Sequence, residues 1–403
     1  IIMAFKFSIK KLLIALTVCI VGVIEKLLNI KVYRVIVSRI GHLALNNDLF
    51  FKRVNAGDLD RHYKFILVGP SESDSHLIAN KTLYQVIKKE AIKNQKIIFI
   101  YSSIIYKLLN ASSAKIKESG IDIELKMHSN EVEFSLYDRV LYLSERDKRK
   151  GWDYLKSINI PNNKKIVCVF ARDPVYLDSQ DIFRDWDWSY HNYRNADIDT
   201  YVPTIKYLIN LGYFVFRIGS IASKRVNYKN KYFLDYPFCD FQSDFMDIFL
   251  IDISEFLIGT TSGITDVATV FHTPFLGVNY APFTESPLGR NDRFIQKKMI
   301  DEFGNVVKYV DALKLGTDDV YIANSYYKRT KLKYMDNTEE EILEATVEME
   351  LFIKGKYKEN KEDKMLFNQY FLNFWKSNTR AKVKTRPCTS WLKKNIDLYV
   401  ERT

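Results

Sequence analysis

The sequence is poor in residues that break or cross-link a chain, with 15 glycines, 9 prolines and 4 cysteines among 403 residues. So little glycine and proline excludes collagen-like and linker-dominated architectures. The cysteines, Cys19, Cys168, Cys239 and Cys388, lie far apart and form no C-x-x-C pair. This spacing argues against a disulfide framework or a zinc site and favours a reducing cytoplasm.

Several catalytic signatures are missing as well. The chain has no G-x-x-x-x-G-K-[ST] phosphate loop, no H-E-x-x-H, no G-x-S-x-G elbow and no G-x-G-x-x-G fingerprint, which argues against NTPases, zinc peptidases, α/β-hydrolases and standard dehydrogenases. The histidines show no ligand-like spacing, so we expect neither a metal nor a cofactor. Asp-x-Asp pairs are weak evidence among 49 acidic residues, and they occur at Asp58/Asp60, Asp185/Asp187 and Asp197/Asp199.

A chain of this length is too long for one ordinary hydrophobic core and suits two domains. Hydrophobic residues make up 47% and charged residues 27%, the profile of a folded globular protein. Short β-rich runs alternate with helix-like stretches, which indicates parallel sheets with crossover helices. In the first series we expect strands at residues 32–36, 65–68, 97–100, 121–125 and 139–143, and a helix at 77–94.

A helix expected at residues 145–158 is followed by Pro161-Asn162-Asn163, where we place the domain boundary. A second α/β series begins there. Pro203 in the first turn and Gly212 after the last mark one of its helices especially clearly. The expected strands are 165–170, 213–218, 255–258 and 274–278, and the expected helices are 199–211, 244–251, 262–271 and 339–354. The tail beyond them is aromatic and is expected to pack back across the domains through Tyr370, Phe371, Phe374 and Trp375.

The formal charge of +11 is concentrated near the two ends of the sequence. Residues 1–40 contain one acid, Glu25, and residues 376–394 contain none. Such basic clusters suit an anionic membrane, nucleic acid or a polyanionic substrate, or form a solvated face that keeps the protein soluble. The basic residues are Lys6, Lys10, Lys11, Lys26, Lys31, Arg34 and Arg39 in the first stretch, and Lys376, Arg380, Lys382, Lys384, Arg386, Lys393 and Lys394 in the second.

The run Leu12–Ile24 is uncharged and mostly aliphatic, but it is shorter than the roughly 20 residues that span a bilayer. Lysines precede and follow it. We interpret residues 1–30 as an interfacial, membrane-associating helix. A signal peptide would also have a basic start and a short apolar run, although no A-x-A-like cleavage site follows. A buried core helix is the other alternative.

Three segments could carry chemistry, and the first follows the first expected strand. It contains Arg39, Gly41 and His42. Glycine lets the backbone turn into a helix whose N–H groups face a ligand. Histidine titrates near neutral pH, so His42 can act as a base or polarise a leaving phosphate. A capping or core histidine is the competing interpretation.

The second segment begins with Arg172 and Asp173, at the carboxyl end of the first strand of the second series, where open α/β sheets bind ligands. It continues through a long polar and aromatic loop that includes Arg194 and Asp197. Loops of that length are usually functional or disordered. Arg194 and Asp197 could instead form a salt bridge that only organises the loop.

The third segment joins two strand ends. One strand ends in Arg217, Gly219 and Ser220, and another is followed by a small, hydroxyl-rich loop that opens a helix. Exposed N–H groups at a helix N-terminus bind diphosphate, and an arginine adds bidentate charge. Ordinary helix capping is the competing interpretation of the loop. Its residues are Thr260, Thr261, Ser262 and Gly263.

The strand–I-G-T-x-S-G–helix pattern resembles the donor-binding half of GT-B transferases such as heptosyltransferases and fucosyltransferase-like enzymes. The whole pattern is similar to a family of bacterial glycosyltransferases found with surface-polysaccharide genes, and it spans about residues 35–285. The resemblance implies a GT-B fold, a nucleotide-sugar donor and a glycan or lipid-linked acceptor. Its motifs are R-I-G-H-L-A at 39–44, H-N-Y-R-N-A-D-I at 191–198, R-x-G at 217–219 and I-G-T-x-S-G at 258–263.

We therefore expect two Rossmann-like domains facing a central cleft, 31–160 for the acceptor and 161–335 for the nucleotide-sugar, followed by C-terminal helices and a basic tail at 336–403. The predicted reaction is metal-independent sugar transfer at the cytoplasmic face of the inner membrane, with the protein peripheral or monotopic. His42 is the expected base and Asp173 the alternative. We expect an anionic membrane surface and no nucleic acid as partners. The rival hypotheses are a nucleotide-sugar 2-epimerase of the same fold and a non-catalytic membrane or polysaccharide assembly protein.

Overall fold

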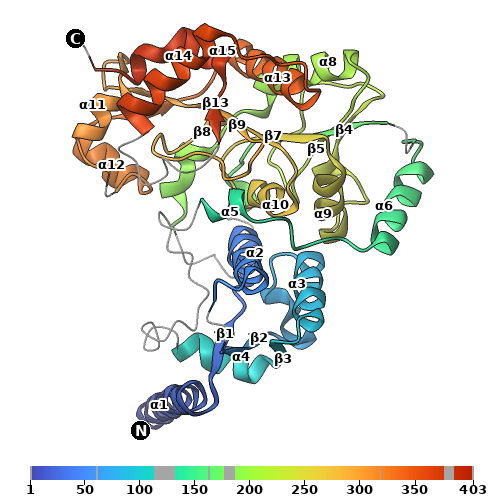
Figure 1. Cartoon of the computed structure of the whole chain (residues 1–403), viewed down its shortest axis with the longest axis vertical. Coiled ribbons are helices and arrows are strands. Elements are labelled where there is room, and N and C mark those ends of the chain that lie inside the picture. Colours follow the sequence, from blue (N-terminus) through green and yellow to red (C-terminus); the bar gives the residue numbers. More distant parts are fainter. Residues whose placement is uncertain are drawn as a thin grey trace. The chain divides into compact units, whose positions relative to one another are not determined.

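A computed structural model describes residues 2–59, 62–112, 132–161, 164–176, 187–317, 319–375 and 385–401 (Figure 1). The chain divides into two compact units. The N-terminal unit comprises Ile1–Lys126 and Tyr137–Tyr142, and the C-terminal unit comprises Met127–Leu136 and Leu143–Thr403. Each unit contains a parallel sheet with helices, so the predicted α/β class is confirmed.

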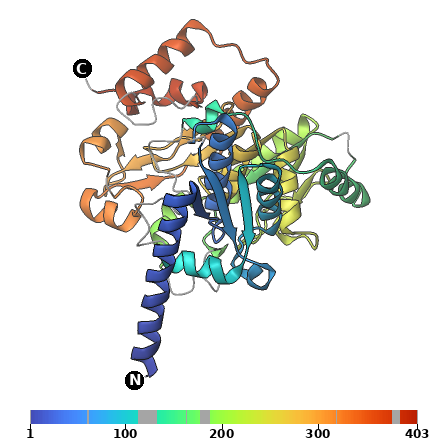
Figure 2. The ribbon, with the colours of Figure 1, turned by 60° about the horizontal axis from the view of Figure 1, so that its bottom comes forward.

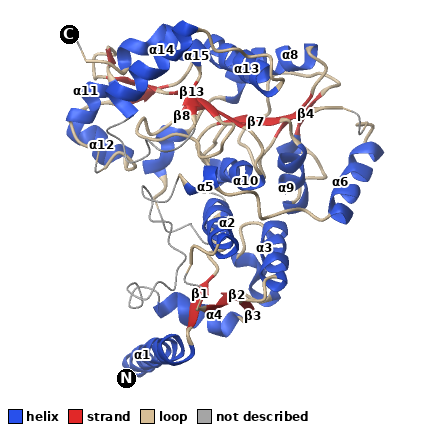
Figure 3. Ribbon diagram, viewed as in Figure 1, coloured by secondary structure: helices blue, strands red, loops and turns tan. Residues whose placement is uncertain are grey.

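The sheet of the N-terminal unit has the order β1-β2-β3, with all strands parallel. Figure 3 shows α2 and α3 on one side of this sheet and α1 and α4 on the other. The strands are β1 (Ile30–Arg34), β2 (Lys64–Gly69) and β3 (Ile97–Tyr101). The helices are α1 (Ile2–Leu28), α2 (Ile40–Ala56), α3 (Lys81–Lys93) and α4 (Ser103–Ser112). The three strands confirm the predictions at residues 32–36, 65–68 and 97–100.

Local chemistry sets the helix ends in this unit. Asn80 caps α3, since its side-chain oxygen accepts a 2.8 Å hydrogen bond from the N–H of Leu83. Gly57 ends α2 in the left-handed region at φ 75°, where glycine meets no steric penalty. The predicted helix at 77–94 begins only at Lys81, because residues Glu72–Leu77 form a separate 3₁₀ turn.

The expected strand at residues 139–143 does not form. Its backbone is irregular and bonds locally, with Arg139 Nε donating to the Leu141 carbonyl at 2.8 Å and the Tyr142 hydroxyl donating to the Arg139 carbonyl at 2.8 Å. The apolar pattern that suggested a strand comes from burial of Leu141 and Leu143. The expected strand at 121–125 lies outside the described residues.

The chain passes into the C-terminal unit near residue 143, earlier than the boundary predicted at 161. Helix α6 (Glu145–Ser157) belongs to this unit because it packs against α9 (Asp244–Ile253). Gly151 makes the close approach possible, since a Cβ there would lie 2.5 Å from the ring of Phe249. Trp152 packs edge-on against the same ring at 5.8 Å between centroids.

The large sheet of the C-terminal unit has the order β13-β9-β8-β7-β4-β5-β6, and its strands are parallel. From β6 to β9 this is the doubly wound order of Rossmann-type sheets. The strands are β4 (Ile166–Phe170), β5 (Phe214–Arg217), β6 (Phe233–Asp235), β7 (Phe256–Gly259), β8 (Phe275–Tyr280), β9 (Arg293–Gln296) and β13 (Arg386–Pro387). A small antiparallel sheet contains β10 (Lys298–Ile300), β11 (Val306–Val307) and β12 (Lys333–Met335).

Helices cover the large sheet, and four of them confirm the predictions at residues 199–211, 244–251, 262–271 and 339–354. In α8 (Val202–Asn210), Pro203 lies in the first turn and Gly212 follows the last turn at φ 90°, as the sequence predicted. The others are α5 (Glu133–Leu136), α10 (Gly263–Phe271), α11 (Tyr309–Lys314), α12 (Ala323–Thr330), α13 (Glu339–Ile353), α14 (Lys361–Tyr370) and α15 (Thr389–Asn395).

The C-terminal helices are part of the core of this unit. Tyr370 and Phe374 are each 1% exposed and pack with Tyr309 and Tyr399 in one aromatic cluster. The hydroxyl of Tyr399 accepts a hydrogen bond from Trp391 Nε1 at 2.9 Å and donates one at 2.8 Å to the side-chain oxygen of Gln296, the last residue of β9. The aromatic tail therefore packs back onto the C-terminal unit. Residues 376–384, with four of the seven basic residues of the basic tail, lie outside the described residues.

We expect Gly151→Ala to destabilise the C-terminal unit by about 1–3 kcal/mol, although alanine favours a helix interior by about 1 kcal/mol. The Phe249 ring that the new methyl group would meet is 0% exposed and has no room to move outward. Urea unfolding followed by circular dichroism measures the effect. Gly22→Ala in α1 is the matched control, since nothing lies within 4 Å of its Cβ position. Equal effects of the two substitutions would contradict this account of α6.

Candidate functional site

The candidate site lies where the carboxyl ends of β4 and β7 meet. The strand order of the C-terminal unit reverses between these neighbours, and ligands bind open α/β sheets at such a switch point. The backbone N–H of Arg172, after β4, donates a 3.0 Å hydrogen bond to the hydroxyl of Thr260, after β7. The structure therefore brings together two of the segments that the sequence singled out.

The side chain of Arg172 is committed to the loop that follows it. Its guanidinium donates to the Asn195 side-chain oxygen, and Lys297 Nζ donates to the Asn195 carbonyl at 2.5 Å. Lys297 also pairs with Asp336 at 2.6 Å, while burial, opposed by Asp336 and assisted by the charge of Arg172, lowers its pKa. Two buried cations thus hold one asparagine at the switch point.

Asp173 is held as an ionised carboxylate. Its Oδ2 accepts hydrogen bonds from the N–H and the hydroxyl of Ser223, and its Oδ1 accepts from the N–H of Val175 at 2.9 Å. Burial acts to raise the pKa of Asp173, but these bonds and the charge of Arg217 outweigh it, so the pKa is lowered. A carboxylate stabilised in this way is a weak base, which counts against Asp173 as the alternative general base.

Arg217 ends β5 as predicted, but its charge is used inside the protein. Its side chain is 3% exposed and bonds to Asp235 at 3.2 Å and to the Lys224 carbonyl at 2.6 Å. Direct contact with a diphosphate would require those bonds to break, so the structure makes Arg217 a positioning residue for the loop after β5. Gly219 has φ 138°, which favours glycine, and Ser220 is exposed.

Arg194 and Asp197 do not form the salt bridge considered above. Asp197 pairs with Lys224 at 2.6 Å, and Lys224 also pairs with Asp199 at 2.7 Å. Arg194 interacts electrostatically with Asp266 instead. Its Nε is buried and has no hydrogen-bond partner within the described part of the chain. Of the three arginines predicted to bind the donor in this unit, Arg172, Arg194 and Arg217, Arg194 is therefore the one that is not already bonded to another part of the protein.

The loop Thr260–Gly263 is tied down by its own hydroxyl groups. Thr261 Oγ1 donates to the Ala281 carbonyl at 2.7 Å, and Ser262 is the N-cap of α10. The hydroxyl of Thr265 accepts from the Ser262 N–H at 3.2 Å and donates to the Ser262 carbonyl at 2.6 Å. Because the first N–H groups of a helix lack acceptors within the helix, Gly263 at N1 begins a turn suited to an anion.

Two acidic residues at this helix start escaped the sequence analysis. Asp266 lies in the first turn of α10, and burial, reinforced by the charge of Glu285 and opposed by Arg194, raises its pKa to about 7. Glu285 is 9% exposed and accepts a hydrogen bond from the Tyr321 hydroxyl. The rule that ligand groups follow strand ends could have identified Glu285, which comes five residues after β8 ends.

In the N-terminal unit, His42 lies in the first turn of α2, with Arg39 at the N-cap and Gly41 beside it. Arg39 Nη2 lies 2.6 Å from His42 Nε2, and since arginine only donates, this nitrogen accepts. Burial and the charge of Arg39 lower the pKa of His42 to about 4, against a smaller raising effect of a hydrogen bond with Asn46. His42 is therefore neutral at pH 7 and able to take a proton once Arg39 releases it.

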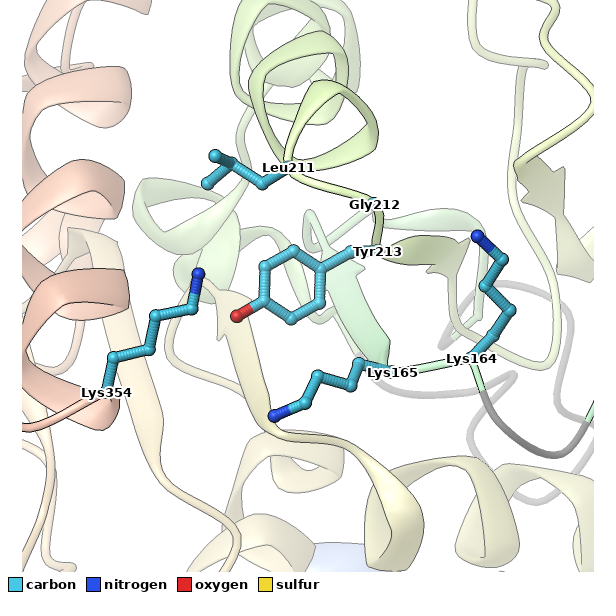
Figure 4. Close-up of a pocket in the computed structure, with 6 residues that line it drawn as sticks. All are labelled: Lys164, Lys165, Leu211, Gly212, Tyr213 and Lys354. Carbon is cyan, nitrogen blue, oxygen red and sulfur yellow. The ribbon is translucent and has the colours of Figure 1, made fainter.

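A pocket of about 240 Å³ opens near the amino ends of β4 and β5, remote along these strands from the switch point (Figure 4). Its lysines are largely matched by acids, since Lys165 pairs with Glu255 at 3.1 Å and Lys354 pairs with Glu350. In Figure 4 the amino group of Lys164 lies to the right of Tyr213, apart from those of Lys165 and Lys354, and it is 4.8 Å from the ring centroid of Tyr232. The pocket therefore offers no converging set of cations.

Among the residues that the structure describes, no three histidine, cysteine or acidic side chains come together as a metal site. Of the Asp-x-Asp pairs, Asp197 and Asp199 both bind Lys224, while Asp60 and Asp185 lie outside the described residues.

Neither a protein-family model nor a curated protein matches the sequence. Solved structures show a distant likeness. The ADP-heptose LPS heptosyltransferase II of E. coli matches with a TM-score of 0.41 and 12% identity over 81% of this chain and 100% of its own. A glycosyl transferase family 9 protein of Veillonella parvula matches with a TM-score of 0.42 and 12% identity over 81% of this chain and 97% of its own. Likeness at this level establishes neither a family nor an activity for the chain.

The neutral state of His42 predicts how the stability of the N-terminal unit depends on pH. Between about pH 6.5 and pH 4, His42 binds a proton in the unfolded state but not in the folded state. As the pH falls through this range, wild type should therefore lose stability relative to His42→Gln. We expect a relative loss of about 1–3 kcal/mol, measured by urea unfolding at several pH values. The exposed His76→Gln is the control, and it should follow wild type. Parallel pH profiles of wild type and His42→Gln would refute the effect.

Proposed function

We propose that the chain is a GT-B glycosyltransferase that moves a sugar from a nucleotide-sugar to a cell-surface polysaccharide or lipid-linked glycan without a metal. The observation that carries the proposal is the switch point of the C-terminal unit, where the Arg172 loop is bonded to the loop that opens α10. A nucleotide diphosphate is the ligand class that suits small residues at the N-terminus of a helix, where the first N–H groups lack acceptors within the helix. We prefer sugar transfer to other nucleotide chemistry because the motifs resemble those of glycosyltransferases.

In this proposal the diphosphate binds at Gly263 and the first turn of α10. Arg194 supplies the charge-assisted hydrogen bonds, since its buried Nε has no partner in the described structure. Asp266 would repel the diphosphate when ionised, but its raised pKa makes a protonated, neutral carboxyl accessible near pH 7. Arg172 and Arg217 act indirectly, by holding the loops that follow β4 and β5.

His42 is the proposed base on the acceptor. The acceptor hydroxyl attacks the anomeric carbon of the donor sugar, its proton passes to His42, and the carbon–oxygen bond to the diphosphate breaks so that nucleoside diphosphate leaves. A neutral imidazole is the form that can accept this proton, but a pKa of about 4 makes it a weak base while Arg39 is bonded to it. Displacement of Arg39 by the acceptor removes one of the two causes that lower this pKa. The acceptor hydroxyl would take the place of Arg39 at Nε2.

The proposed place of the reaction is an anionic membrane surface at the cytoplasmic face of the inner membrane, with the protein peripheral or monotopic. The basic N-terminal stretch and the basic tail support this choice, because cationic clusters bind anionic headgroups. In the described part of the chain no helix is long and apolar enough to cross a bilayer.

A thermal-shift panel of UDP, GDP, ADP and CMP tests whether the chain binds nucleotide. We expect one nucleoside diphosphate to raise the melting temperature of the C-terminal unit, since a ligand at 100 times its Kd stabilises the folded state by about 2.7 kcal/mol. Arg194→Gln should weaken the shift. No shift with any nucleotide would refute the proposal and favour the non-catalytic assembly protein.

His42→Ala should fold and bind the nucleotide as wild type does, yet lose transfer by about 10²–10⁴-fold, because it lacks the base. The assay uses the radiolabelled nucleotide-sugar that matches the panel result, with total bacterial membrane lipid as acceptor. Transfer by wild type should persist in EDTA. Near wild-type turnover would remove His42 from the mechanism, and an epimerised nucleotide-sugar as the product would identify the 2-epimerase instead.

The ionisation of Asp266 predicts the pH dependence of nucleotide binding. As the pH rises from 6 to 8 the carboxyl becomes charged, so the Kd of wild type for the diphosphate should increase by up to about tenfold more than that of Asp266→Asn. Comparing the two proteins cancels the titration of the phosphate itself. The exposed Asp311→Asn is the control and should follow wild type. Identical pH profiles for wild type and Asp266→Asn would place this carboxyl away from the diphosphate.

A further inference from the structure

Lys297 is a buried cation that the proposed transfer step does not involve. It lies between β9 and β10, and its side chain is 3% exposed. Its Nζ pairs with Asp336 at 2.6 Å and donates to the backbone carbonyl of Asn195 at 2.5 Å. Because a buried ammonium is costly unless oxygen atoms satisfy its donors, these two contacts hold the Lys297 side chain in one place.

Every polar group of Asn195 is bonded. Its side-chain oxygen accepts from Arg172, and its side-chain nitrogen donates to the side-chain oxygen of Asn192 at 3.2 Å. Its backbone N–H donates to the Asn192 carbonyl at 3.0 Å, and its backbone carbonyl accepts from Lys297. Two of these four bonds therefore come from cations outside the loop, Arg172 and Lys297.

Tyr193 is fixed as well, on the other side of Arg194 in the sequence. Its ring stacks on that of Tyr334 in β12, with 5.4 Å between the centroids and 29° between the planes. In Figure 1 and Figure 2 the light-green turn of residues 189–194 lies beside the orange segment that includes α12 and β12. The end of β12 therefore anchors both neighbours of Arg194, since Tyr334 holds one directly and Asp336 holds the other through the lysine that it pairs with.

Arg194 lies between these two fixed residues, and it interacts electrostatically with Asp266 in the first turn of α10. No hydrogen bond within the described part of the chain holds its buried Nε. We propose that Lys297 is a positioning residue for the diphosphate, because its bond to Asn195 fixes the backbone that presents Arg194 to the start of α10. The inference rests on the proposed function, since it takes Arg194 as the ligand of the diphosphate. A side chain on ordered backbone loses less entropy when it binds, so loss of the Lys297 bond should weaken binding.

Lys298 offers a matched control, since this neighbour also forms a 2.6 Å ion pair. Its Nζ pairs with Glu341 in α13 and lies 5.3 Å from the centroid of the Trp391 ring. Neither partner belongs to the loop that carries Arg194. Lys298→Met should therefore lower the free energy of unfolding, because it removes one partner of a partly buried ion pair, and leave nucleotide binding unchanged.

Titration calorimetry of the full chain with UDP, GDP and ADP tests the inference. For the nucleotide that binds, Lys297→Met should raise the Kd about tenfold, the size expected for groups coupled in one hydrogen-bond network. Lys297→Arg keeps the cation and should lose less affinity. In the Arg194→Gln background, Lys297→Met should change the Kd by less than about twofold, because it acts through Arg194. Equal effects of Lys297→Met in the two backgrounds would overturn the inference.

Hydrogen exchange measures the order of the loop without nucleotide. Peptides that cover residues 189–196 should exchange faster in Lys297→Met than in wild type, while Lys298→Met should exchange as wild type does. Equal exchange of these peptides in the two variants would also overturn the inference.

Lys297→Met should fold, because the Asp336 side chain that it leaves unpaired is 43% exposed and can meet water. Should it not fold, Lys297→Gln is the second variant, since it keeps a donor for Asp336, and the same outcomes apply to it. Binding of none of the three nucleotides by wild type would refute the proposed function. Wild-type binding whose Kd Lys297→Met leaves unchanged would overturn only this inference.

Discussion

The parallel sheet of the C-terminal unit is the constraint on which the rest of the structure depends. Its central strands β4 and β7 are buried on both faces, so they can carry only apolar side chains along their length. Parallel strands all end at the same edge, and polar residues collect there because the core excludes them. The hydrogen bond from Arg172 to Thr260 joins the two loops at the switch point. Every chemical feature proposed for this unit follows from that edge.

At this edge the competition among charges decides which side chains can serve a ligand. A buried arginine without a partner costs several kcal/mol, so Arg217 pairs with Asp235 and Arg172 bonds to Asn195. These side chains fix loops rather than ligands. Arg194 and Asp266 differ from these residues. The buried Nε of Arg194 has no hydrogen-bond partner in the described structure, and the pKa of the Asp266 carboxyl is raised to about 7. Structural charges and ligand-binding charges therefore share one edge and differ in whether a partner is already present.

The N-terminal unit also contains a parallel sheet, and its distinctive feature is helix α1. Helix α1 covers the sheet with one apolar face and leaves a second apolar face outward. A helix of this kind has little contrast between its two sides, so its pattern in the sequence suggests a buried core helix as readily as a surface one. Burial of Val21 and exposure of Leu16 separate the two faces.

The sequence by itself determined the α/β class, most strands and helices, and the loops that end at the switch point, because period, capping residues and strand ends are local signals. It failed at residues 139–143, where burial of Leu141 and Leu143 produces a strand-like pattern without a strand partner. Only the tertiary structure decided the strand order, the place of α6 against α9, and the partners of each charge. Those depend on contacts between residues distant in the chain, such as the ion pairs of Arg217 with Asp235 and of Lys297 with Asp336. No local pattern encodes such contacts.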